Sequence, residues 1–132
     1  MKSIAVMRLR EARVLLDTEN YSGAYYLCGY AVECGLKACI AKETKRFEFP
    51  DKKFTNDCHT HNLENLVNLS GLKAELKREQ DADPDFRDNW ATTKDWNEIS
   101  RYEEHDKNEA ADLYSAISGK NHGVLRWVKK YW

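Results

Sequence analysis

The most regular hydrophobic pattern in the chain runs from Tyr21 to Lys42 and predicts one long helix. Small residues recur there at intervals of three and four positions, which is the period of one helix face. This small-residue stripe consists of Ala24, Cys28, Ala31, Cys34 and Ala38. A second, bulkier stripe consists of Tyr25, Val32, Leu36 and Ile40. A helix that is apolar on two sides packs on both, so we expect this segment to be the central helix of an all-α domain.

A third stripe on the same helix is amphipathic, and it consists of Tyr26, Tyr30, Glu33 and Lys37. Glu33 and Lys37 have the spacing of an ordinary helix-surface ion pair, which contributes roughly 0.3–0.5 kcal/mol. In a functional interpretation, Lys37 binds a phosphate and Tyr30 stacks on a base, as aromatic platforms do. In a structural interpretation, the two tyrosines belong to a dimer interface. The pattern leaves both interpretations open.

Shorter helical patterns precede and follow the central helix. The first helix is expected from about Ser3 to Asp17, and the turn at Thr18–Asn20 makes the first two helices antiparallel neighbours. The segment from Lys42 to Asp57 is predicted to be a polar connection that carries Phe47, Phe49 and Pro50, and proline excludes a helix interior there.

The middle of the chain carries helix-start signals. Asn62 is predicted to cap a short helix containing Leu63, Leu66, Val67 and Leu69. Ser70–Gly71 interrupts this helix, and Leu72–Glu79 is expected to form a further helical piece. Asp83 and Pro84 fit the cap and first position of the next helix, whose apolar anchors are Phe86 and Trp90.

The last third of the chain is predicted to hold one loop and one helix. Trp96–Glu104 is expected to be the loop, and the helix runs from about Asp106 to Lys130. Gly119 and Gly123 lie inside this helix and each cost about 1 kcal/mol relative to alanine, so a kink is expected there. The sequence has no β pattern, repeat or low-complexity linker, so the expected fold class is an all-α antiparallel bundle that forms a single domain, residues 1–132.

Composition narrows the function classes. The chain has 132 residues, 42% of them hydrophobic and 33% charged, which excludes a disordered class. The net charge of -1 gives no general attraction for nucleic acid, so any RNA contact has to come from a local cluster. No apolar run approaches the ~20 residues of a membrane span. The N-terminal residues are charged throughout and lack a signal-peptide segment, so a cytoplasmic protein without a membrane partner is expected.

The four cysteines are not expected to form disulfides or a metal site. Cys28, Cys34 and Cys39 fall on the apolar faces of the central helix and resemble small core residues. Cys58, His59 and His61 place three potential ligands within four residues, which is a poor arrangement for one zinc ion. We therefore expect no metal and no cofactor, and a polar loop leading into a helix.

The run Arg101–His105, with the sequence RYEEH, is the strongest candidate for chemistry. Arginine can grip a phosphate with two parallel hydrogen bonds, and histidine can move a proton near neutral pH. A helix beginning at Asp106 or Lys107 would place its N-terminus nearby and favour an anion. The negative charges of Glu103 and Glu104 would repel a phosphate. The alternative to a phosphate site is a solvated helix start with Tyr102 packed on the core.

The C-terminal sequence RWVKKYW also mixes cations with aromatics, but a helix end with Trp127 in the core is the favoured interpretation there.

Several of these segments together resemble the HEPN family of small all-α domains. The resemblance rests on Glu11-Ala12 with Leu15-Leu16, Tyr21 and Ala24; on Ala31-Val32-Glu33 with Leu36-Lys37-Ala38; on His61 with Leu63 and Leu66; and on Trp96, Arg101-Tyr102 and Trp127. Together they span nearly the whole chain in a fixed order and spacing.

The resemblance implies an antiparallel bundle of four to five helices, which in this family is usually a homodimer. Many family members are ribonucleases, often toxins of toxin–antitoxin or phage-defence systems, and others act beside a minimal nucleotidyltransferase and bind nucleotides. In the ribonucleases, an arginine followed by a polar residue precedes a histidine by four to six intervening residues, and the pairs from two subunits cut RNA without a metal. Here Arg101 is followed by Tyr102, and His105 comes after only three intervening residues.

Two hypotheses follow, one a binding module and one an enzyme. In the first, a dimeric domain binds a nucleotide, an RNA phosphate or a nucleotidyltransferase-like partner without cutting. Its candidate binding residues are Arg101, Tyr102, Lys37, Glu33, Tyr30 and Arg13. In the second, a metal-independent endoribonuclease uses Arg101 and His105. The departure from the family's arginine–histidine spacing favours the first, and a dimer with only a structural role is the third alternative.

Overall fold

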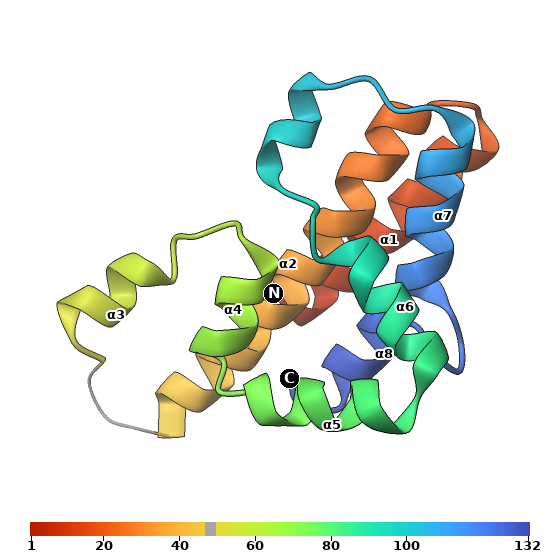
Figure 1. Ribbon diagram of the computed structural model, residues 1–132. Coiled ribbons are helices and arrows are strands. Elements are labelled where there is room, and N and C mark those ends of the chain that lie inside the picture. The colour runs from red at the N-terminus through yellow and green to blue at the C-terminus, as the bar shows by residue number, and fades with distance from the viewer. Residues whose placement is uncertain (47–49) are drawn as a thin grey trace.

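The computed structural model describes residues 1–46 and 50–132, and these residues form helices and no strand (Figure 1). The elements in chain order are α1 (Lys2–Asp17), α2 (Tyr21–Arg46), α3 (Lys52–Asp57), α4 (Leu63–Leu69), α5 (Lys73–Ala82), α6 (Pro84–Thr93), the 3₁₀-helix η1 (Glu98–Tyr102), α7 (Lys107–Ser118) and α8 (Val124–Lys129). The expected all-α fold class is confirmed.

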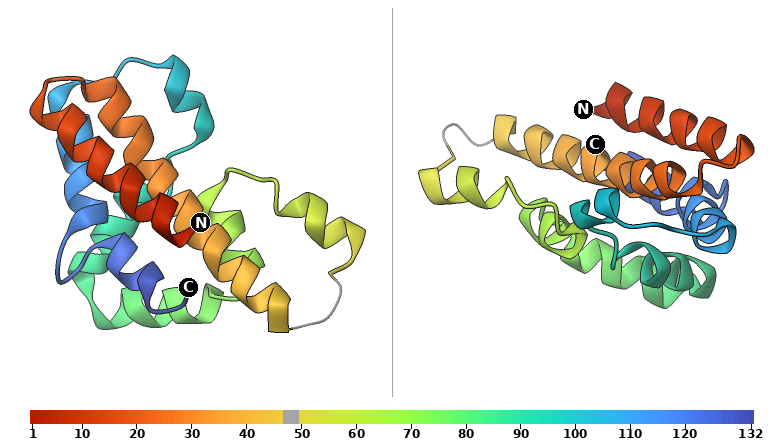
Figure 2. Two further views of the ribbon diagram at one scale, coloured as in Figure 1. Left: turned by 180° about the vertical axis from the view of Figure 1, so that it is seen from behind. Right: turned by 90° about the horizontal axis from the view of Figure 1, so that it is seen from above.

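Helices α1 and α2 form an antiparallel pair joined by a tight turn (Figure 2). The Thr18 hydroxyl donates to the Val14 carbonyl at 2.8 Å, and Glu19 takes a positive φ of 62°. Ala12 of α1 and the small-residue stripe of α2 are buried, with Ala24 and Ala31 fully inaccessible. Small side chains let the two helix backbones approach closely. Both expected helices are confirmed: α1 begins one residue earlier than predicted, and α2 begins at Tyr21 as predicted but extends beyond Lys42 to Arg46.

α2 is the central helix, as its double apolar stripe predicts. It contacts α1 on one side and α4, α7, α8 and η1 on the others (Figures 1 and 2). Val32 and Leu36 of the bulkier stripe are fully buried within the main hydrophobic cluster. Burying one such side chain contributes about 1.5–3 kcal/mol, so α2 supplies much of the stabilising contact.

The expected polar connection after α2 is partly wrong. α2 continues to Arg46, and α3 forms inside the same segment because the Asp51 carboxylate accepts a hydrogen bond from the Phe54 amide at 2.7 Å. Phe54 packs against the main cluster and attaches α3 to the bundle. Phe47 and Phe49 lie outside the described residues.

The helix starts in the middle of the chain are confirmed. The Asn62 side chain accepts from the Asn65 amide at 2.9 Å and caps α4, and the Asp83 side chain accepts from the Phe86 amide at 3.1 Å and caps α6. Gly71, with φ of 74°, separates α4 from α5. Phe86 and Trp90 are both nearly inaccessible and anchor α6. These starts are local features, and the sequence alone locates them.

The prediction of a single last helix is wrong, because the segment forms two helices, α7 and α8. The Gly123 amide donates to the Gly119 carbonyl at 3.1 Å and closes a turn. A Cβ atom at Gly123 would lie only 2.3 Å from the Gly119 oxygen, so this turn requires glycine. The two glycines therefore end one helix and begin another. The C-terminal sequence forms α8, in which Trp127 is buried with its ring centroid 5.6 Å from that of Phe86, so the expectation that Trp127 lies in the core is confirmed.

The expected loop from Trp96 to Glu104 contains η1, which Asn97 caps through the Ile99 amide. Its approach to α2 depends on Trp96, which is 2% exposed, and on Gly29, where an added Cβ atom would lie 2.2 Å from the Trp96 ring. The indole therefore lies flat on the helix backbone and holds η1 against the N-terminal half of α2. None of the described helices is long and apolar enough to cross a membrane.

Candidate functional site

The amphipathic stripe of α2 begins with a pair of stacked tyrosines. The Tyr26 and Tyr30 rings lie nearly parallel, with centroids 6.0 Å apart and an interplanar angle of 7°. Tyr26 also approaches the Trp96 ring at 5.9 Å. Both tyrosines are half-buried, so each packs on the helix by one side and meets solvent by the other. The result is an aromatic surface on the N-terminal half of α2.

Arg101 of η1 lies beside this aromatic surface. Its guanidinium carbon is 4.9 Å from the centroid of the Tyr102 ring. The phenols of Tyr102 and then Tyr26 acquire negative charge at high pH and raise the pKa of Arg101 above its ordinary value. Among the described residues, no carboxylate forms an ion pair with Arg101. Tyr102 is 77% exposed, so the expectation that it packs on the core is wrong. Arg101 is therefore an exposed, unneutralised cation next to aromatic rings.

The start of α7 does not offer the anion site that a free helix N-terminus would. α7 begins at Lys107, and Asp106 accepts from the Glu109 amide at 2.8 Å while the Glu109 side chain accepts from the Asp106 amide at 2.9 Å. This capping box fills the helix N-terminus with two carboxylates. Negative charge is already present where a phosphate was expected, so any phosphate near Arg101 has to be held by side chains.

His105 lies in a pocket of its own. Its ring stacks on Tyr25, with centroids 3.7 Å apart, and its side chain is only 11% exposed. Glu109 lies 3.4 Å from Nδ1, and Glu103 lies 3.6 Å from Nε2. The His105 amide donates to the Ser22 hydroxyl at 2.9 Å, which ties the segment before α7 to the start of α2. The imidazole therefore has mainly structural contacts, and Nε2 is buried without a hydrogen bond.

The structure does not bring all the sequence-predicted site residues together. No hydrogen bond or ion pair between described residues joins Arg101 to His105. Arg13 is on α1, where it bonds Asp17 at 3.0 Å and lies over the Tyr114 ring at 5.5 Å. Arg13 thus belongs to the α1–α7 side of the bundle, whereas Tyr30, Glu33 and Lys37 share the amphipathic stripe of α2.

The C-terminal half of that stripe holds a charged cluster, here called the Glu33 cluster and made of Glu33, Lys37 and His61. Glu33 Oε1 accepts from Lys37 Nζ at 2.9 Å and lies 2.9 Å from His61 Nδ1. The Glu33 side chain is 3% exposed, against 20% for Lys37 and 44% for His61. The expected ion pair is confirmed, but its acid is buried.

Burial changes what this ion pair means. The second oxygen of Glu33, Oε2, is buried and has no hydrogen-bond partner in the protein. A buried carboxylate is costly unless its charge and both oxygens are satisfied, and leaving an oxygen unpaired costs about 1–3 kcal/mol. The Glu33 cluster is therefore expected to contribute little to the free energy of unfolding.

The partnership between Glu33 and His61 is the site feature that sequence reasoning missed. The two residues are 28 positions apart, and His61 was grouped with Cys58 and His59 as a polar loop before a helix. His61 directly precedes Asn62, the cap of α4, and α4 packs on α2. The available signal was the resemblance itself, in which both Glu33 and His61 belong to matching segments.

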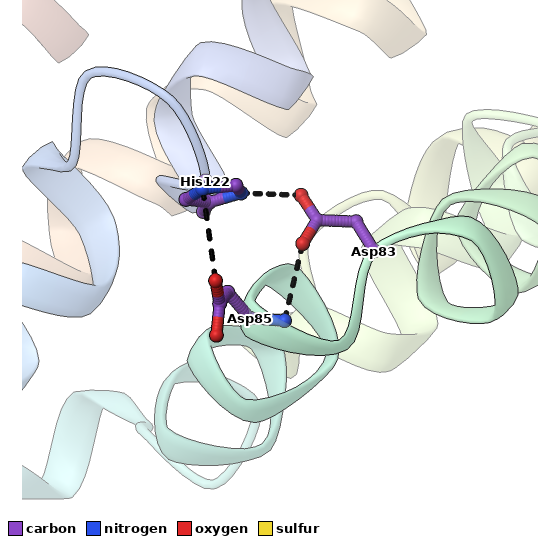
Figure 3. Close-up of side chains that lie close together, drawn as sticks. All are labelled: Asp83, Asp85 and His122. Atoms are coloured by element: carbon purple, nitrogen blue, oxygen red, sulfur yellow. Dashed lines mark hydrogen bonds and ion pairs between the residues drawn. The ribbon is translucent and has the colours of Figure 1, made fainter.

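A second polar cluster consists of Asp83 and Asp85 at the start of α6 and His122 between α7 and α8 (Figure 3). His122 Nδ1 lies 2.6 Å from Asp83 Oδ2, and His122 Nε2 lies 3.7 Å from Asp85. One potential ligand atom from each residue lies within 4.8 Å of the others. The ion pair and the Asp83 helix cap account for all three side chains, so the cluster is a clasp between α6 and the α7–α8 turn.

The cysteine thiols fit a core role. Burial raises the pKa of Cys28 to about 12 and that of Cys39 to about 11. Thiols with such pKa values carry almost no thiolate near neutral pH and are poor nucleophiles. Cys39 donates weakly to the Val128 carbonyl at 3.8 Å, which joins α2 to α8.

Comparison with known proteins identifies one family. The model described as the HEPN domain matches residues 1–131. No curated protein and no solved structure matches the chain. The match covers the central helix, the Glu33 cluster and the segment with Arg101 and His105.

Proposed function

Because the chain belongs to the HEPN family, we propose that it is a HEPN-domain protein that binds a nucleotide or an RNA phosphate as a dimer. The binding surface is the amphipathic stripe of α2 together with η1. Arg101 holds a phosphate, Tyr30 and Tyr26 stack on a base, and Lys37 adds a second positive charge toward the other end of the stripe. The protein carries no cofactor in this proposal.

One observation carries the proposal: Arg101 is exposed, lies over the Tyr102 ring close to Tyr26 of the stacked pair, and forms no ion pair with a carboxylate of the described residues. Arginine donates two parallel hydrogen bonds to phosphate, and stacking of a base on an aromatic ring is worth about 1–3 kcal/mol. In a chain with net charge -1, binding depends on such a local cluster. Lys37 is already bonded to Glu33 and contributes less than Arg101.

The dimer and the partner rest on the family and on exposed apolar side chains. Ile99 and Tyr102 of η1 are 55% and 77% exposed, and Met7 and Val14 of α1 are 44% and 57% exposed. In the proposal, these side chains lie in the contact with a second copy of the chain or with another protein. In the proposal, the chain acts in the cytoplasm as a homodimer, alone or beside a minimal nucleotidyltransferase, including within a toxin–antitoxin pair.

Cleavage by Arg101 and His105 has less support. His105 stacks on Tyr25 and faces the carboxylates of Glu103 and Glu109, and its Nε2 is buried. A proton acceptor has to reach the hydroxyl that it activates. The geometry therefore favours binding over a ribonuclease that depends on this pair.

A binding titration with matched arginine variants tests the proposal. Fluorescently labelled single-stranded RNA and a labelled nucleotide are titrated with wild type, Arg101→Ala and Arg126→Ala. Arg126 is a suitable control because it is exposed and forms no ion pair among the described residues, but it lies on α8. Loss of a charge-assisted contact of about 1.5–3 kcal/mol should raise Kd about 10–100-fold for Arg101→Ala only. Equal losses in both variants would indicate diffuse electrostatics and contradict the site.

A further inference from the structure

Asp83, Asp85 and His122, which form the clasp between α6 and the α7–α8 turn, are also a set of potential metal ligands (Figure 3). Among the described residues, these are the ones whose ligand atoms gather in a group of three, each within 4.8 Å of the others. Both carboxylates are directed toward the imidazole ring. Two carboxylates and one imidazole are a donor set that suits divalent transition metals, zinc among them.

The negative charge of the clasp exceeds what His122 neutralises. Two carboxylates face one imidazole, so one negative charge is left when the ring is protonated and two are left when the ring is neutral. No lysine or arginine of the described residues forms an ion pair with either aspartate. A divalent cation beside a neutral imidazole would balance both carboxylates, whereas the proton on His122 balances only one of them.

Hydrogen bonds to the backbone hold two of the three ligands in place. Asp83 Oδ1 accepts from the amides of Asp85 and Phe86, each at 3.1 Å. This leaves Asp83 Oδ2 for His122 Nδ1, at 2.6 Å. The Asn89 side chain donates to the His122 carbonyl at 2.9 Å and fixes the backbone of that ligand. Supporting bonds of this kind orient ligands before a metal arrives and raise its affinity.

The clasp is also open to a metal ion from solvent. The His122 side chain is 46% exposed and that of Asp85 is 76% exposed. Donor atoms around a tetrahedral zinc ion lie about 3.4 Å apart. The contacts of His122 with Asp83 and Asp85, at 2.6 and 3.7 Å, fall on either side of that value. Rotation of the exposed Asp85 side chain therefore brings the three donors around one ion.

We propose that Asp83, Asp85 and His122 bind a zinc ion that joins α6 to the α7–α8 turn. The ion replaces the proton on His122 Nδ1, and the neutral ring keeps its one proton on Nε2. From the charged ring, binding therefore releases one proton to the solvent. Water completes the four ligands of the ion. The site lies outside the α2 and η1 surface, so this inference does not rest on the proposed function.

The experiment titrates the full chain with zinc sulfate in a calorimeter and compares its thermal unfolding in zinc and in EDTA. The variants are His122→Gln, Asp85→Asn, Asp88→Asn and His59→Ala. Asp88 is the matched control for Asp85, because it is another exposed aspartate of α6 and lies outside the group. His59 is the matched control for His122, because it is an exposed imidazole from another part of the chain. Asp85 is exposed, so its substitution leaves the fold intact.

Wild type should bind one zinc ion per chain. Zinc at about 100 times its Kd should raise Tm by at least about 4 °C relative to EDTA, because the ion binds the folded chain. Asp85→Asn and His122→Gln should each raise the Kd for zinc at least about tenfold and lose most of the Tm increase. Asp88→Asn and His59→Ala should bind zinc with the wild-type Kd.

Four results would overturn the inference. Absence of binding by folded wild type at about 1 mM zinc leaves no site of useful affinity. Wild-type affinity in Asp85→Asn or in His122→Gln locates the ion elsewhere. Loss of binding in His59→Ala assigns it to the cysteine–histidine run before α4. Equal losses in Asp85→Asn and Asp88→Asn indicate a general attraction of zinc to acidic residues. The proposed binding of a nucleotide or RNA stands or falls separately, by the arginine titration.

Discussion

At the scale of single residues, the absence of a side chain at Gly29 lets the segment that carries Arg101 lie close to α2. The Trp96 ring occupies the space that a Cβ atom would fill, and η1 with Arg101 follows only a few residues later. The position of Arg101 beside Tyr26 therefore depends on a glycine in the middle of α2.

Gly29→Ala should destabilise the protein and weaken RNA binding. The added Cβ atom would lie 2.2 Å from the Trp96 ring, and forcing such a contact costs about 1–3 kcal/mol or more. This exceeds the gain in helix propensity of about 1 kcal/mol. Urea unfolding followed by tryptophan fluorescence measures the loss.

Gly23→Ala supplies the control for this substitution. It lies on the same helix, but its added Cβ atom would meet only the end of the flexible Leu15 side chain, at 3.2 Å. The propensity gain should then dominate, and the free energy of unfolding should stay the same or rise by up to about 1 kcal/mol. Equal destabilisation by both substitutions would contradict the Trp96 contact.

At the scale of elements, the clasp of Asp83, Asp85 and His122 holds the start of α6 against the turn between α7 and α8 (Figure 3). The Asn89 side chain adds a bond to the His122 carbonyl at 2.9 Å. The His122 hydrogen bond lowers the pKa of Asp83, and the same bond to Asp83 raises the pKa of His122.

These opposite shifts predict a pH window for the clasp. His122 contributes stability below its ordinary pKa of 6.5 and loses it as pH rises through its raised value. Asp83 contributes above its ordinary pKa of 3.8 and loses it as pH falls through its lowered value. The Tm difference between wild type and His122→Ala should be largest between pH 3.8 and 6.5 and shrink above neutral pH. A difference that does not vary with pH would contradict the clasp.

Element boundaries were predictable from the sequence where local chemistry sets them. Asn62 and Asp83 cap helices through their own neighbours, so their residue types sufficed. The break between α7 and α8 was not predictable from the sequence, because the apolar spacing of a helix continues across Gly119 and Gly123. The turn becomes evident only from the close contact between these two glycines in the structure. The contact of His61 with Glu33 depends on how α4 docks on α2, and no local pattern reports it.

At the scale of the whole molecule, exposed apolar side chains lie on two separate elements, α1 and η1. We predict that the protein is a homodimer. Sedimentation should show a species of about twice the 15.4 kDa chain mass. A protein concentration on the order of tens of micromolar suits this measurement, because it exceeds a dimer dissociation constant in the micromolar range. A species of 15.4 kDa alone would count against the dimer.

The account's central claim is that a nucleotide or RNA phosphate binds along the amphipathic stripe of α2 next to η1. Chemical-shift mapping with labelled protein and a short single-stranded RNA tests it most directly, because every region of the chain is observed at once. We predict that the largest shifts fall on Tyr26, Tyr30, Lys37 and Arg101, and that residues 124–132, with their own cations and aromatics, remain unshifted. Shifts concentrated on residues 124–132, or spread evenly over all basic residues, would contradict the account.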